Sequence, residues 1–592
     1  MLTLRLLPLS FGTVVALVLA VTVRRTMERA PSAGDEHSRR TPHVAVKRAD
    51  VVIIGSGLAG LMAAVHASDV DPSVRVLVLE QNAQVGGNSA KATSGMNVVR
   101  SVNGSDSVLR FVEDAMAASH HAADPKLLEI MAQQSEQVWD ELQTRFGVEL
   151  TDVTQLGGHS VPRSFRIPPK ADGTPRPLGW TIIAAVKRIV LALPNVQVVT
   201  LARVTVLFEC NDETLRSGAL ACIGVRAQLG SPSAEFSAPD ASSEELVLYA
   251  PAVILASGGF CASRALLAKY APQVQHLPTT NGAWARGDGL VLAERFHVGV
   301  RDLNAVQVHP TGFLSLPDIS KDSVLLAPEA LRGTGGILLS PRSGRRFANE
   351  LAPRDVLTNL ELQHGMHVLE WLDTVIPKSS TSSAASLAAR AHAFLTESGK
   401  LDAFRESHVI SDLRGGETPE NLQPYPMVVT YLLMTPECVD HFGLGAALFY
   451  EKVGALHSFE SASDAAAAMG ISEAVLQEEL TRYASDASSA TGDRFGKTVF
   501  PHAHSFADSQ RVWVGLVTPS LHYSMGGLTV NGRAELLDMR SQDPVPGLFG
   551  AGEVTGGVHG QNRLGGNALL ECAVFGSIAG RNAAVFSIRR GN

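Results

Sequence analysis

The chain has 592 residues, of which 45% are hydrophobic and 18% are charged, and its formal net charge is −8. These fractions are typical of a globular enzyme, and no block of like charges indicates nucleic-acid binding. None of the five cysteines forms a C-x-x-C or C-x-x-C-H motif, so we expect no metal site of the zinc or iron–sulfur kind and no attached c-type haem.

The N-terminal segment differs in composition from the rest of the chain. Residues 6–23 carry no charge and are flanked by arginines on both sides. We therefore expect residues 1–26 to be a signal peptide, a signal anchor that tethers the chain to a membrane through residues 6–23, or an organelle-targeting segment. The acid-free start favours the mitochondrion, and the endoplasmic reticulum or secretory membrane is the alternative. Residues 27–49 are polar and predict a linker.

Residues 50–80 carry all parts of a dinucleotide-binding unit. A β-branched run at 50–54 leads directly into G-x-G-x-x-G at 55–60, and residues 61–67 predict a helix. A second apolar run, 74–79, ends at Glu80. A strand, a glycine turn, a helix and a second strand that ends in an acid form the βαβ unit that binds dinucleotides.

Each of the four key residues has its own physical task. Gly55 permits the tight turn, Gly57 lets the backbone approach a pyrophosphate, and Gly60 lets the helix pack closely on the strand. The helix N-terminus offers N–H groups and a positive dipole end to the phosphates. Glu80 can accept hydrogen bonds from a ribose diol.

The next segment narrows the choice of dinucleotide. Residues 86–97 read GGNSAKATSGMN, which resembles the second FAD-binding segment of the fumarate reductase and succinate dehydrogenase flavoprotein family. The resemblance is closest to the soluble, single-chain eukaryotic branch. In membrane-bound relatives a histidine of this segment bonds covalently to FAD. Ser89 stands at the corresponding position, and because a hydroxyl cannot make that bond, we expect non-covalent FAD.

The resemblance runs from about residue 50 to the end and implies an α/β fold. A Rossmann-type FAD-binding domain, formed by residues 50–302 and 522–592, is then interrupted by an α+β capping domain at 303–521. Beside the motif glycines and Glu80, the family pattern implies FAD contacts from Leu58, Ala59, Gln81, Asn88, Ser89, Ser94, Gly95, Met96, Asn97, Val204, Ser257, Gly258, Asp288, Glu553, Asn567, Leu569 and Leu570.

Hydrophobic periodicity and composition predict further elements along the chain. In chain order we expect two helices within 108–143, a helix at 179–193, a strand at 196–200, a surface hairpin with its loop at 211–243, one buried strand at 247–255, a low-complexity surface insertion at 379–389, a helix at 476–483 and a closing helix at 571–583.

Three motifs supply candidates for binding a carboxylated substrate. QVHPT at 307–311, HYSMGG at 522–527 and NRLGGN at 562–567 resemble family motifs whose histidines and arginine contact substrate carboxylates. An arginine suits this task because its planar donors match two oxygens at once. Since the chain is acidic overall, a dianion must rely on such a local cationic pocket. The resemblance implies substrate contacts from His309, Thr311, His522 and Arg563.

Two more motifs supply candidates for proton transfer. FANELAPRD at 347–355 and PEALRG at 328–333 resemble family segments, and the resemblance implies that Arg354 protonates the substrate while Glu329 and Arg332 relay protons to it. A guanidinium normally keeps its proton, so proton loss must be concerted with resupply through the relay. The alternative is that Arg354 only stabilises charge and that water is the proton donor.

The implied activity is FAD-dependent reduction of fumarate to succinate. Flavin N5 gives a hydride to one alkene carbon, and Arg354 gives a proton to the other. With no haem or cluster motif, electrons must come from a diffusible donor, either NADH or a reduced flavin. One alternative is the same fold acting on another small acid: an enoate, succinate or L-aspartate. Another is a non-enzymatic flavin-binding protein or assembly factor, which the complete set of cationic residues disfavours. His502 and His504 we interpret as loop histidines.

Overall fold

The structure is a computed structural model. It describes residues 45–100, 106–170, 176–209, 222–230, 244–374, 386–408, 424–489, 491–508 and 511–591. The predicted targeting segment, most of the predicted linker, and parts of the predicted hairpin at 211–243 and insertion at 379–389 lie outside the described residues.

A six-stranded sheet carries the dinucleotide-binding unit. Its strand order is β21-β22-β11-β2-β3-β7, and all neighbours pair in parallel except β21, which runs antiparallel to β22. The segment that forms β22 comes from the far end of the chain, so the two halves of the predicted FAD-binding domain build one sheet. This confirms the Rossmann-type α/β fold. The strands are β2 (Val51–Ile54), β3 (Val76–Leu79), β7 (Val196–Val199), β11 (Ala252–Leu255), β21 (Glu535–Leu537) and β22 (Pro544–Gly550).

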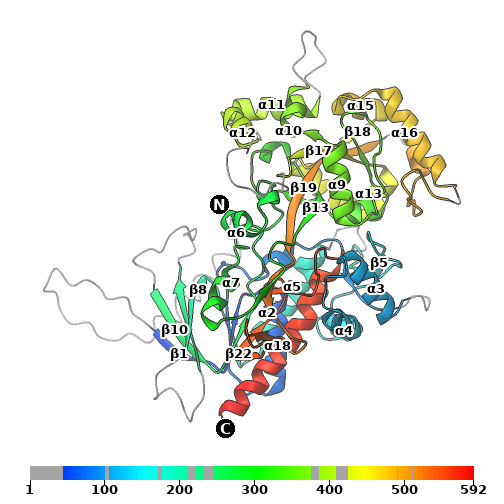
Figure 1. The fold of residues 1–592 in the computed structure, drawn as a ribbon. Coiled ribbons are helices and arrows are strands. Elements are labelled where there is room, and N and C mark those ends of the chain that lie inside the picture. Colours follow the sequence, from blue (N-terminus) through cyan, green and yellow to red (C-terminus); the bar gives the residue numbers. More distant parts are fainter. Residues whose placement is uncertain are drawn as a thin grey trace, which may run out of the picture. The chain divides into compact units, whose positions relative to one another are not determined.

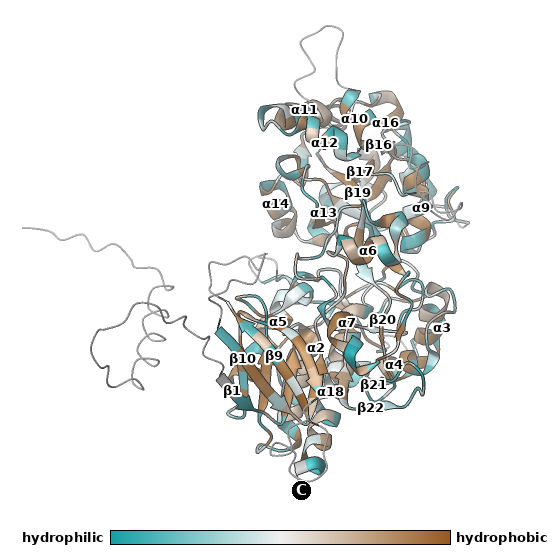
Figure 2. Cartoon of the chain, turned by 60° about the vertical axis from the view of Figure 1, so that its left-hand side comes forward, coloured by the Kyte–Doolittle hydropathy of each residue, from teal (hydrophilic) through white to brown (hydrophobic). Residues whose placement is uncertain are grey.

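Two helices pack against each other beside this sheet. α2 (Leu58–Val70) follows the glycine turn and buries its first eleven residues, and much of it has a hydrophobic colour in Figure 2. The closing helix α18 (Asn567–Gly591) runs along α2 (Figure 1). A Cβ atom on Gly580 would lie 2.2 Å from the carbonyl oxygen of Ala63. The two backbones therefore touch, which explains why glycine stands there.

Within the described residues, α18 is also the one helix that is long and apolar enough to cross a membrane. Most of its apolar window is buried inside the protein. Its hydrophobicity is therefore explained by packing against α2 and the sheet.

A four-stranded sheet, β1-β10-β9-β8, corrects the predicted linker. β1 (Ala45–Arg48) pairs in parallel with β10 (Glu244–Ala250), and β10 continues antiparallel to β9 (Ile223–Leu229). Residues 45–48 are thus part of a sheet and not of a linker. β9 in turn pairs with β8 (Ala202–Glu209), so the described part of the predicted hairpin at 211–243 is an inner strand.

The single strand predicted at 247–255 is wrong. The chain forms β10 up to Ala250, passes Pro251, and starts β11 at Ala252 in the six-stranded sheet. Proline has no N–H to give to a sheet, so it ends the pairing of β10 and lets the chain change sheets. The unbroken run of apolar residues hid this change.

A seven-stranded antiparallel sheet is built from residues between Val306 and Ser524. Its main order is β14-β13-β19-β17-β15, with β16 added on β17 and β18 on β19. A second hydrophobic core lies around this sheet, separate from the core of the six-stranded sheet. The strands are β13 (Val306–Phe313), β14 (Leu325–Leu326), β15 (Ile337–Leu339), β16 (Met366–His367), β17 (Val428–Met434), β18 (Leu456–Phe459) and β19 (Val512–Ser524).

Helices surround this second sheet, as Figure 1 shows. They are α8 (Glu329–Gly333), α9 (Arg354–His364), α10 (Val368–Asp373), α11 (Leu387–Glu397), α12 (Leu401–His408), α13 (Pro436–Phe442), α14 (Leu444–Lys452), α15 (Ala462–Met469), α16 (Glu473–Asp486) and α17 (Ser505–Asp508). The helix predicted at 476–483 lies within α16 and is confirmed. The predicted insertion at 379–389 ends inside α11, whose N-terminus is capped by Ser386.

The remaining elements complete the fold. The two helices predicted within 108–143 and the helix at 179–193 are confirmed as α3, α4 and α5. The elements are α3 (Val108–Ala118), α4 (Pro125–Thr144), α5 (Leu178–Ala192), α6 (Arg264–Tyr270), α7 (Asp288–Ala293) and two small sheets of β4 (Met96–Asn97), β5 (Asp152–Thr154) and β6 (Ser164–Arg166), and of β12 (Val300–Arg301), β20 (Gly527–Thr529) and β23 (Thr555–Gly556).

We expect Gly580→Val to lower the free energy of unfolding by about 1–3 kcal/mol, because the new side chain must push α18 away from the backbone of α2. Chemical unfolding followed by circular dichroism measures the loss. Arg589→Val is the matched control, since it puts the same side chain on the exposed part of α18 and should change stability by only about 0.5 kcal/mol. Equal losses in both variants would contradict the close contact.

Candidate active site

A cavity of about 470 Å³ lies at the carboxyl ends of four parallel strands. Its lining includes Gly55, Glu80, Ala256 and Ala551, which directly follow β2, β3, β11 and β22. Open α/β sheets bind their ligands at this edge. The fold therefore creates the cavity where the sequence predicted the cofactor.

The glycine turn shapes one wall of the cavity. Gly55 has a φ of +102°, and a Cβ there would lie 2.3 Å from the carbonyl oxygen of Ala256. A Cβ on Gly60 would lie 2.0 Å from the carbonyl oxygen of Gly55, which agrees with its predicted packing role. Gly57 is the N-cap of α2. The helix N-terminus at this glycine-lined wall fits a pyrophosphate.

Two side chains hold this turn in shape. The buried carboxylate of Glu80 accepts hydrogen bonds from the backbone N–H of Ser56 at 3.1 Å, from its hydroxyl at 2.6 Å and from the N–H of Asn82 at 2.8 Å. Ser89 Oγ accepts a hydrogen bond from the N–H of Leu58 at 3.2 Å. The hydroxyl of Ser89 therefore lies at the N-terminus of α2, beside the phosphate-binding turn.

The predicted cofactor residues divide into two groups. Those that line the cavity are Gly55, Gly57, Leu58, Ala59, Glu80, Gln81, Asn88, Ser89, Ser94, Gly95, Val204, Ser257, Gly258, Asp288, Glu553 and Leu569. Gly60, Met96, Asn97, Asn567 and Leu570 do not line it.

Asn97 shows what a residue behind the lining does. Its side-chain amide donates to the carbonyl oxygen of Gly565 at 2.7 Å and to Oδ1 of Asn567, also at 2.7 Å. It thereby fixes the loop that carries Arg563. Because a buried amide needs its hydrogen bonds, Asn97 positions the lining without touching the cavity.

Several lining residues were not predicted. Lys91 lies inside the quoted segment 86–97, and its ammonium donates to the carbonyl oxygen of Thr280 at 2.5 Å. Trp284, Phe449 and Tyr450 also line the cavity. The last two come from α14, and only the tertiary fold, not any local pattern, brings that helix to the cavity.

The polar end of the cavity gathers residues from four motifs. Arg354, His522 and Arg563 line it. The imidazole rings of His309 and His522 lie 5.1 Å apart, centre to centre, so His309 packs behind His522. The backbone N–H of Thr311 donates to Nδ1 of His309 at 3.1 Å. Thr311 and His309 are buried and do not line the cavity.

One glutamine connects the two arginines. Gln307 Oε1 accepts from Arg354 Nη1 at 2.8 Å and from Arg563 Nη2 at 3.2 Å, and its amide donates to the carbonyl oxygen of Arg563 at 2.8 Å. Gln307 belongs to the QVHPT motif, but we predicted no function for it from the sequence. Its residue type was the one available indication, because an amide oxygen can accept hydrogen bonds from two cationic side chains at once.

A buried ion pair joins Arg354 to Glu329. Arg354 Nε and Nη2 donate to Glu329 Oε2 at 2.9 and 2.8 Å, and Glu329 Oε1 accepts from the N–H of Gly157 at 2.6 Å. Arg332 lies close enough to act on Glu329 by charge. Among the described residues, however, no hydrogen bond joins the two. Arg332 Nη1 donates to the carbonyl oxygen of Glu350, while its Nε and Nη2 are buried and have no hydrogen-bond partner in the described part of the chain.

Burial and nearby cations set the protonation states at this end. Burial works to raise the pKa of Glu329, but Arg354 and Arg332 outweigh it, so the pKa lies below its usual value. Burial, followed by the charge of Arg354, holds the pKa of both His309 and His522 well below 6.5. Burial and Arg354 lower the pKa of Arg563 to about 10. At neutral pH the histidines are uncharged and the arginines supply the positive charge.

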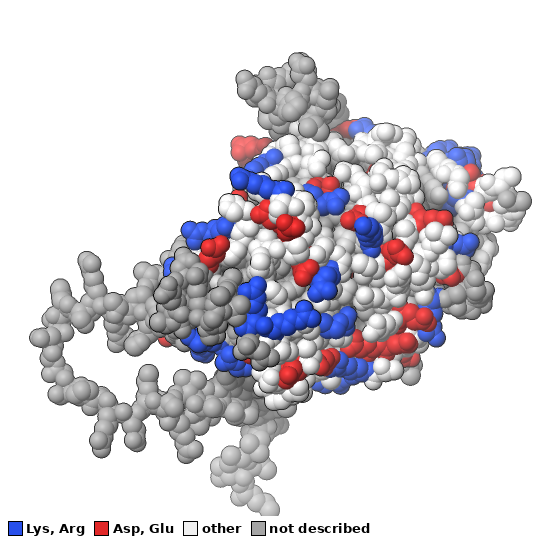
Figure 3. Space-filling model, turned by 60° about the horizontal axis from the view of Figure 1, so that its bottom comes forward, with Lys and Arg blue, Asp and Glu red and all other residues white. Residues whose placement is uncertain are grey.

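The positive charge of Arg354 and Arg563 is confined to this end of the cavity. On the face seen in Figure 3, Lys and Arg side chains are interspersed with Asp and Glu. The chain as a whole is acidic, at −8. An anionic substrate would therefore be held by the buried arginines, whose field is stronger in a desolvated cavity than at the surface.

Comparisons with known proteins agree with this geometry. Residues 50–569 match the family model described as FAD binding domain. The chain is 31% identical over 542 residues to fumarate reductase 1 of Saccharomyces cerevisiae, which covers 90% of this chain and 98% of that protein. It is also 31% identical to the fumarate reductase of Schizosaccharomyces pombe, over 91% of this chain and 90% of that protein. Among solved structures, the open conformation of a flavocytochrome c3 fumarate reductase is similar, with a TM-score of 0.61 and 25% identity over 92% of this chain and 79% of that one.

Glu553 gives a testable pH dependence. Burial raises its pKa to about 7 from an ordinary 4.5, against the hydrogen bonds from Ser524. Folding thus favours the protonated form, so its stabilising contribution is full below pH 4.5, falls between 4.5 and 7, and is lost above. As the pH rises through this range, the ionisation of Glu553 should lower the free energy of unfolding of the apoprotein by up to roughly 3 kcal/mol. Glu553→Gln should remove that loss.

Unfolding of the two apoproteins in urea at pH 5 and pH 8 measures the difference. The decisive quantity is the difference in free energy of unfolding between the wild type and Glu553→Gln, compared at the two pH values. A constant gap would mean that Glu553 is ionised throughout and that the assigned direction is wrong.

Proposed function

Because the chain belongs to the FAD-dependent fumarate reductase family, we propose that it reduces fumarate to succinate. One observation carries this proposal: Arg354, Arg563 and His522, which come from three distant motifs, line one end of the cofactor cavity. Arg354 is also held there by a buried ion pair with Glu329. A short dicarboxylate with an activated double bond is the substrate that such a site suits.

FAD is the cofactor, and when bound it supplies the hydride. The glycine turn and the N-terminus of α2 would hold its pyrophosphate, and Glu80 its ribose. Ser257 Oγ lines the cavity, and it is buried without a hydrogen-bond partner in the described chain, so it is available to a cofactor atom. We propose that binding is non-covalent, because the segment 86–97 contains no histidine at all.

Binding of the substrate is assigned to Arg563 and His522. The Arg563 guanidinium would hold a carboxylate through two parallel hydrogen bonds, and Gln307 keeps it oriented. His522 Nδ1 lies 2.8 Å from the hydroxyl of Thr280, which leaves Nε2 to the substrate. His309 supports this ring from behind. Polarising the carboxylates activates the double bond between them.

Protonation is assigned to Arg354. Its ion pair with Glu329 supports a concerted step, in which the arginine gives a proton to the alkene carbon while the glutamate side resupplies it. Arg332 acts on Glu329 by charge but shares no hydrogen bond with it among the described residues, so it would take part in the relay through a bridging water. The alternative, in which Arg354 only stabilises charge and water is the donor, makes Glu329 a positioning residue.

The electron donor is proposed to be diffusible, either NADH or a reduced flavin. The NADH:fumarate oxidoreductase of Klebsiella pneumoniae is a relative at 28% identity, of which this chain covers 48%. We also propose that residues 1–26 direct the chain to the mitochondrion, with tethering to the endoplasmic reticulum or secretory membrane through residues 6–23 as the alternative. N-terminal sequencing of the mature protein and cell fractionation distinguish these destinations.

Other substrates of the same fold form the second hypothesis. Relatives include a urocanate reductase of Eggerthella lenta, at 25% identity, and an L-aspartate oxidase of Caulobacter vibrioides, at 28%. Steady-state assays with a reduced viologen should give turnover with fumarate and little with urocanate or a monocarboxylic enoate, because two carboxylates are needed to engage the cations. Inactivity with fumarate beside turnover of a larger enoate would overturn the choice of substrate.

We expect Arg354→Lys to lower kcat by about 10²–10⁴-fold, the usual loss when a positioned proton donor is removed. A lysine keeps the charge but loses the fork that holds Glu329 and Gln307 together. The bound flavin should keep its absorbance spectrum. Arg342→Lys is the matched control, since Arg342 is a half-exposed arginine paired with Glu370, and its kcat should not change. Full activity in Arg354→Lys would refute the assignment.

Glu329→Gln separates the relay from the alternative. If Glu329 passes protons, the variant should lose kcat with little change in KM, because an amide cannot take up and return a proton. If Glu329 only positions Arg354, the isosteric amide should keep most of kcat, because its oxygen can still accept hydrogen bonds from Arg354. Steady-state kinetics at neutral pH measure kcat and KM.

A further inference from the structure

A cluster of three histidines and one glutamate lies away from the cofactor cavity. Glu437 and His441 are four residues apart on α13, so both side chains project from the same face of this helix. His502 and His504 lie in the turn that precedes α17, and both contact Glu437 on α13. From the sequence we interpreted these two as loop histidines. In the fold they lie beside the carboxylate of Glu437.

Two imidazole nitrogens lie near one oxygen of Glu437. Glu437 Oε2 lies 3.4 Å from His502 Nδ1 and 3.0 Å from His504 Nε2. In a tetrahedral zinc site with ligand bonds of about 2.0–2.1 Å, neighbouring ligand atoms are roughly 3.3 Å apart. Both imidazole nitrogens lie near the same carboxylate oxygen, but the three ligand atoms are not all within 4.8 Å of one another. The His504 ring, which is 77% exposed, must therefore swing toward His502 to complete a metal site.

His441 supplies the outer partner that such a site requires. Its Nδ1 lies 2.9 Å from Nε2 of His502. When His502 donates its Nε2 proton to His441, the tautomer is fixed and the lone pair on Nδ1 points to the carboxylate. Metal-binding histidines almost always have their second nitrogen held in this way.

The backbone at His502 is also held in an unusual state. Its φ is +53°, in the left-handed region that a non-glycine residue rarely adopts. Three other histidines of the described chain, His120, His121 and His297, share this conformation, so it describes the turn and is not by itself a sign of a ligand site. Here the ring is held between His441 and Glu437.

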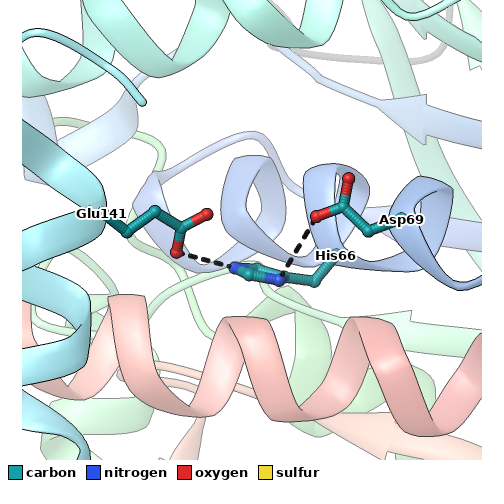
Figure 4. Close-up of side chains that lie close together, drawn as sticks. All are labelled: His66, Asp69 and Glu141. Carbon is teal, nitrogen blue, oxygen red and sulfur yellow. Dashed lines mark hydrogen bonds and ion pairs between the residues drawn. The ribbon is translucent and has the colours of Figure 1, made fainter. Parts of the chain in front are cut away.

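A second cluster of ligand-type residues provides the contrast. His66, Asp69 and Glu141 lie close together between α2 and α4 (Figure 4). The guanidinium of Arg145 already forms ion pairs with both acids, at 2.7 and 3.0 Å, and Arg581 lies 3.3 Å from His66. A cation would have to displace these arginines, so this cluster is a structural ion-pair network.

The first cluster has no such competitor. In the part of the chain that the structure describes, no guanidinium or ammonium forms an ion pair with Glu437. Its partners there are the two imidazoles. The side chains of His502, Glu437 and His504 are 30%, 47% and 77% exposed, so an ion can enter from solvent. Neutral imidazoles and one carboxylate give the donor set that Zn²⁺ prefers over Mg²⁺ or Ca²⁺.

We propose that Glu437, His502 and His504 bind one Zn²⁺ ion, with water as the fourth ligand and His441 as the hydrogen-bonded outer partner. Cu²⁺ and Ni²⁺ suit the same nitrogen-rich set. The ion would cross-link the turn at 501–504 to α13. We expected no zinc site from the cysteine pattern, and this site differs because it uses no cysteine. It is separate from the flavin cavity and does not depend on the proposed reaction.

Calorimetry on the full-length, FAD-loaded protein after treatment with a chelator tests the proposal. Zinc chloride should bind at one ion per chain, and His502→Ala/His504→Ala should weaken that binding at least tenfold. His441→Phe should weaken it by about 10–100-fold, as expected for an outer partner. The flavin spectrum reports that each variant is folded.

Two controls make the result specific. His392→Ala removes a histidine elsewhere in the chain, on α11, and should bind zinc as the wild type does. The d–d spectrum of Co²⁺, used in place of Zn²⁺, should show a tetrahedral nitrogen–oxygen site that is lost in the double variant. The absence of zinc binding in the wild type, or an unchanged affinity in the double variant, would overturn the proposal.

Discussion

A buried ion pair between Arg354 and Glu329 is the interaction on which the site depends. Taking two charges out of water costs several kcal/mol each, and the cost is offset only when both have all their hydrogen bonds. All three nitrogens of Arg354 donate a hydrogen bond, to Glu329 or Gln307, and both oxygens of Glu329 accept one, from Arg354 or from the N–H of Gly157. Loss of either partner leaves an unpaired charge beside the flavin cavity.

The rest of the fold brings these groups together. Arg354 begins α9, Glu329 begins α8, Gln307 comes from β13, and Arg563 precedes α18. No two of them are neighbours in the sequence. A parallel sheet creates a cavity at its carboxyl edge, and the antiparallel sheet built from residues 306–524 brings the arginine and glutamate to that cavity. In the proposed mechanism the same residues therefore serve stability and chemistry, because the pair that needs burial is also the pair to which we assign proton transfer.

Much of this was visible in the sequence, for definite physical reasons. The turn at 55–60 needs glycine at 55, where φ is +102°, and at 60, where a Cβ would lie 2.0 Å from the carbonyl oxygen of Gly55. Both requirements arise within the turn itself. The same holds for helices such as α4 and α16, whose periodicity is local too. The sheet change at Pro251 was missed because its two strands form one apolar run. The positioning roles of Gln307 and Asn97 were not predicted, because they consist of hydrogen bonds to residues far along the chain.

The most direct test of the account is a single-turnover experiment on the wild-type protein. The bound flavin is reduced anaerobically and mixed with fumarate in a stopped-flow instrument, and its reoxidation is followed by absorbance. If the cations and the cofactor act on one dicarboxylate, reoxidation by fumarate will be many times faster than in buffer, and a monocarboxylic enoate will not reproduce it. Reoxidation at the same rate with fumarate, with the enoate and with buffer would contradict the account.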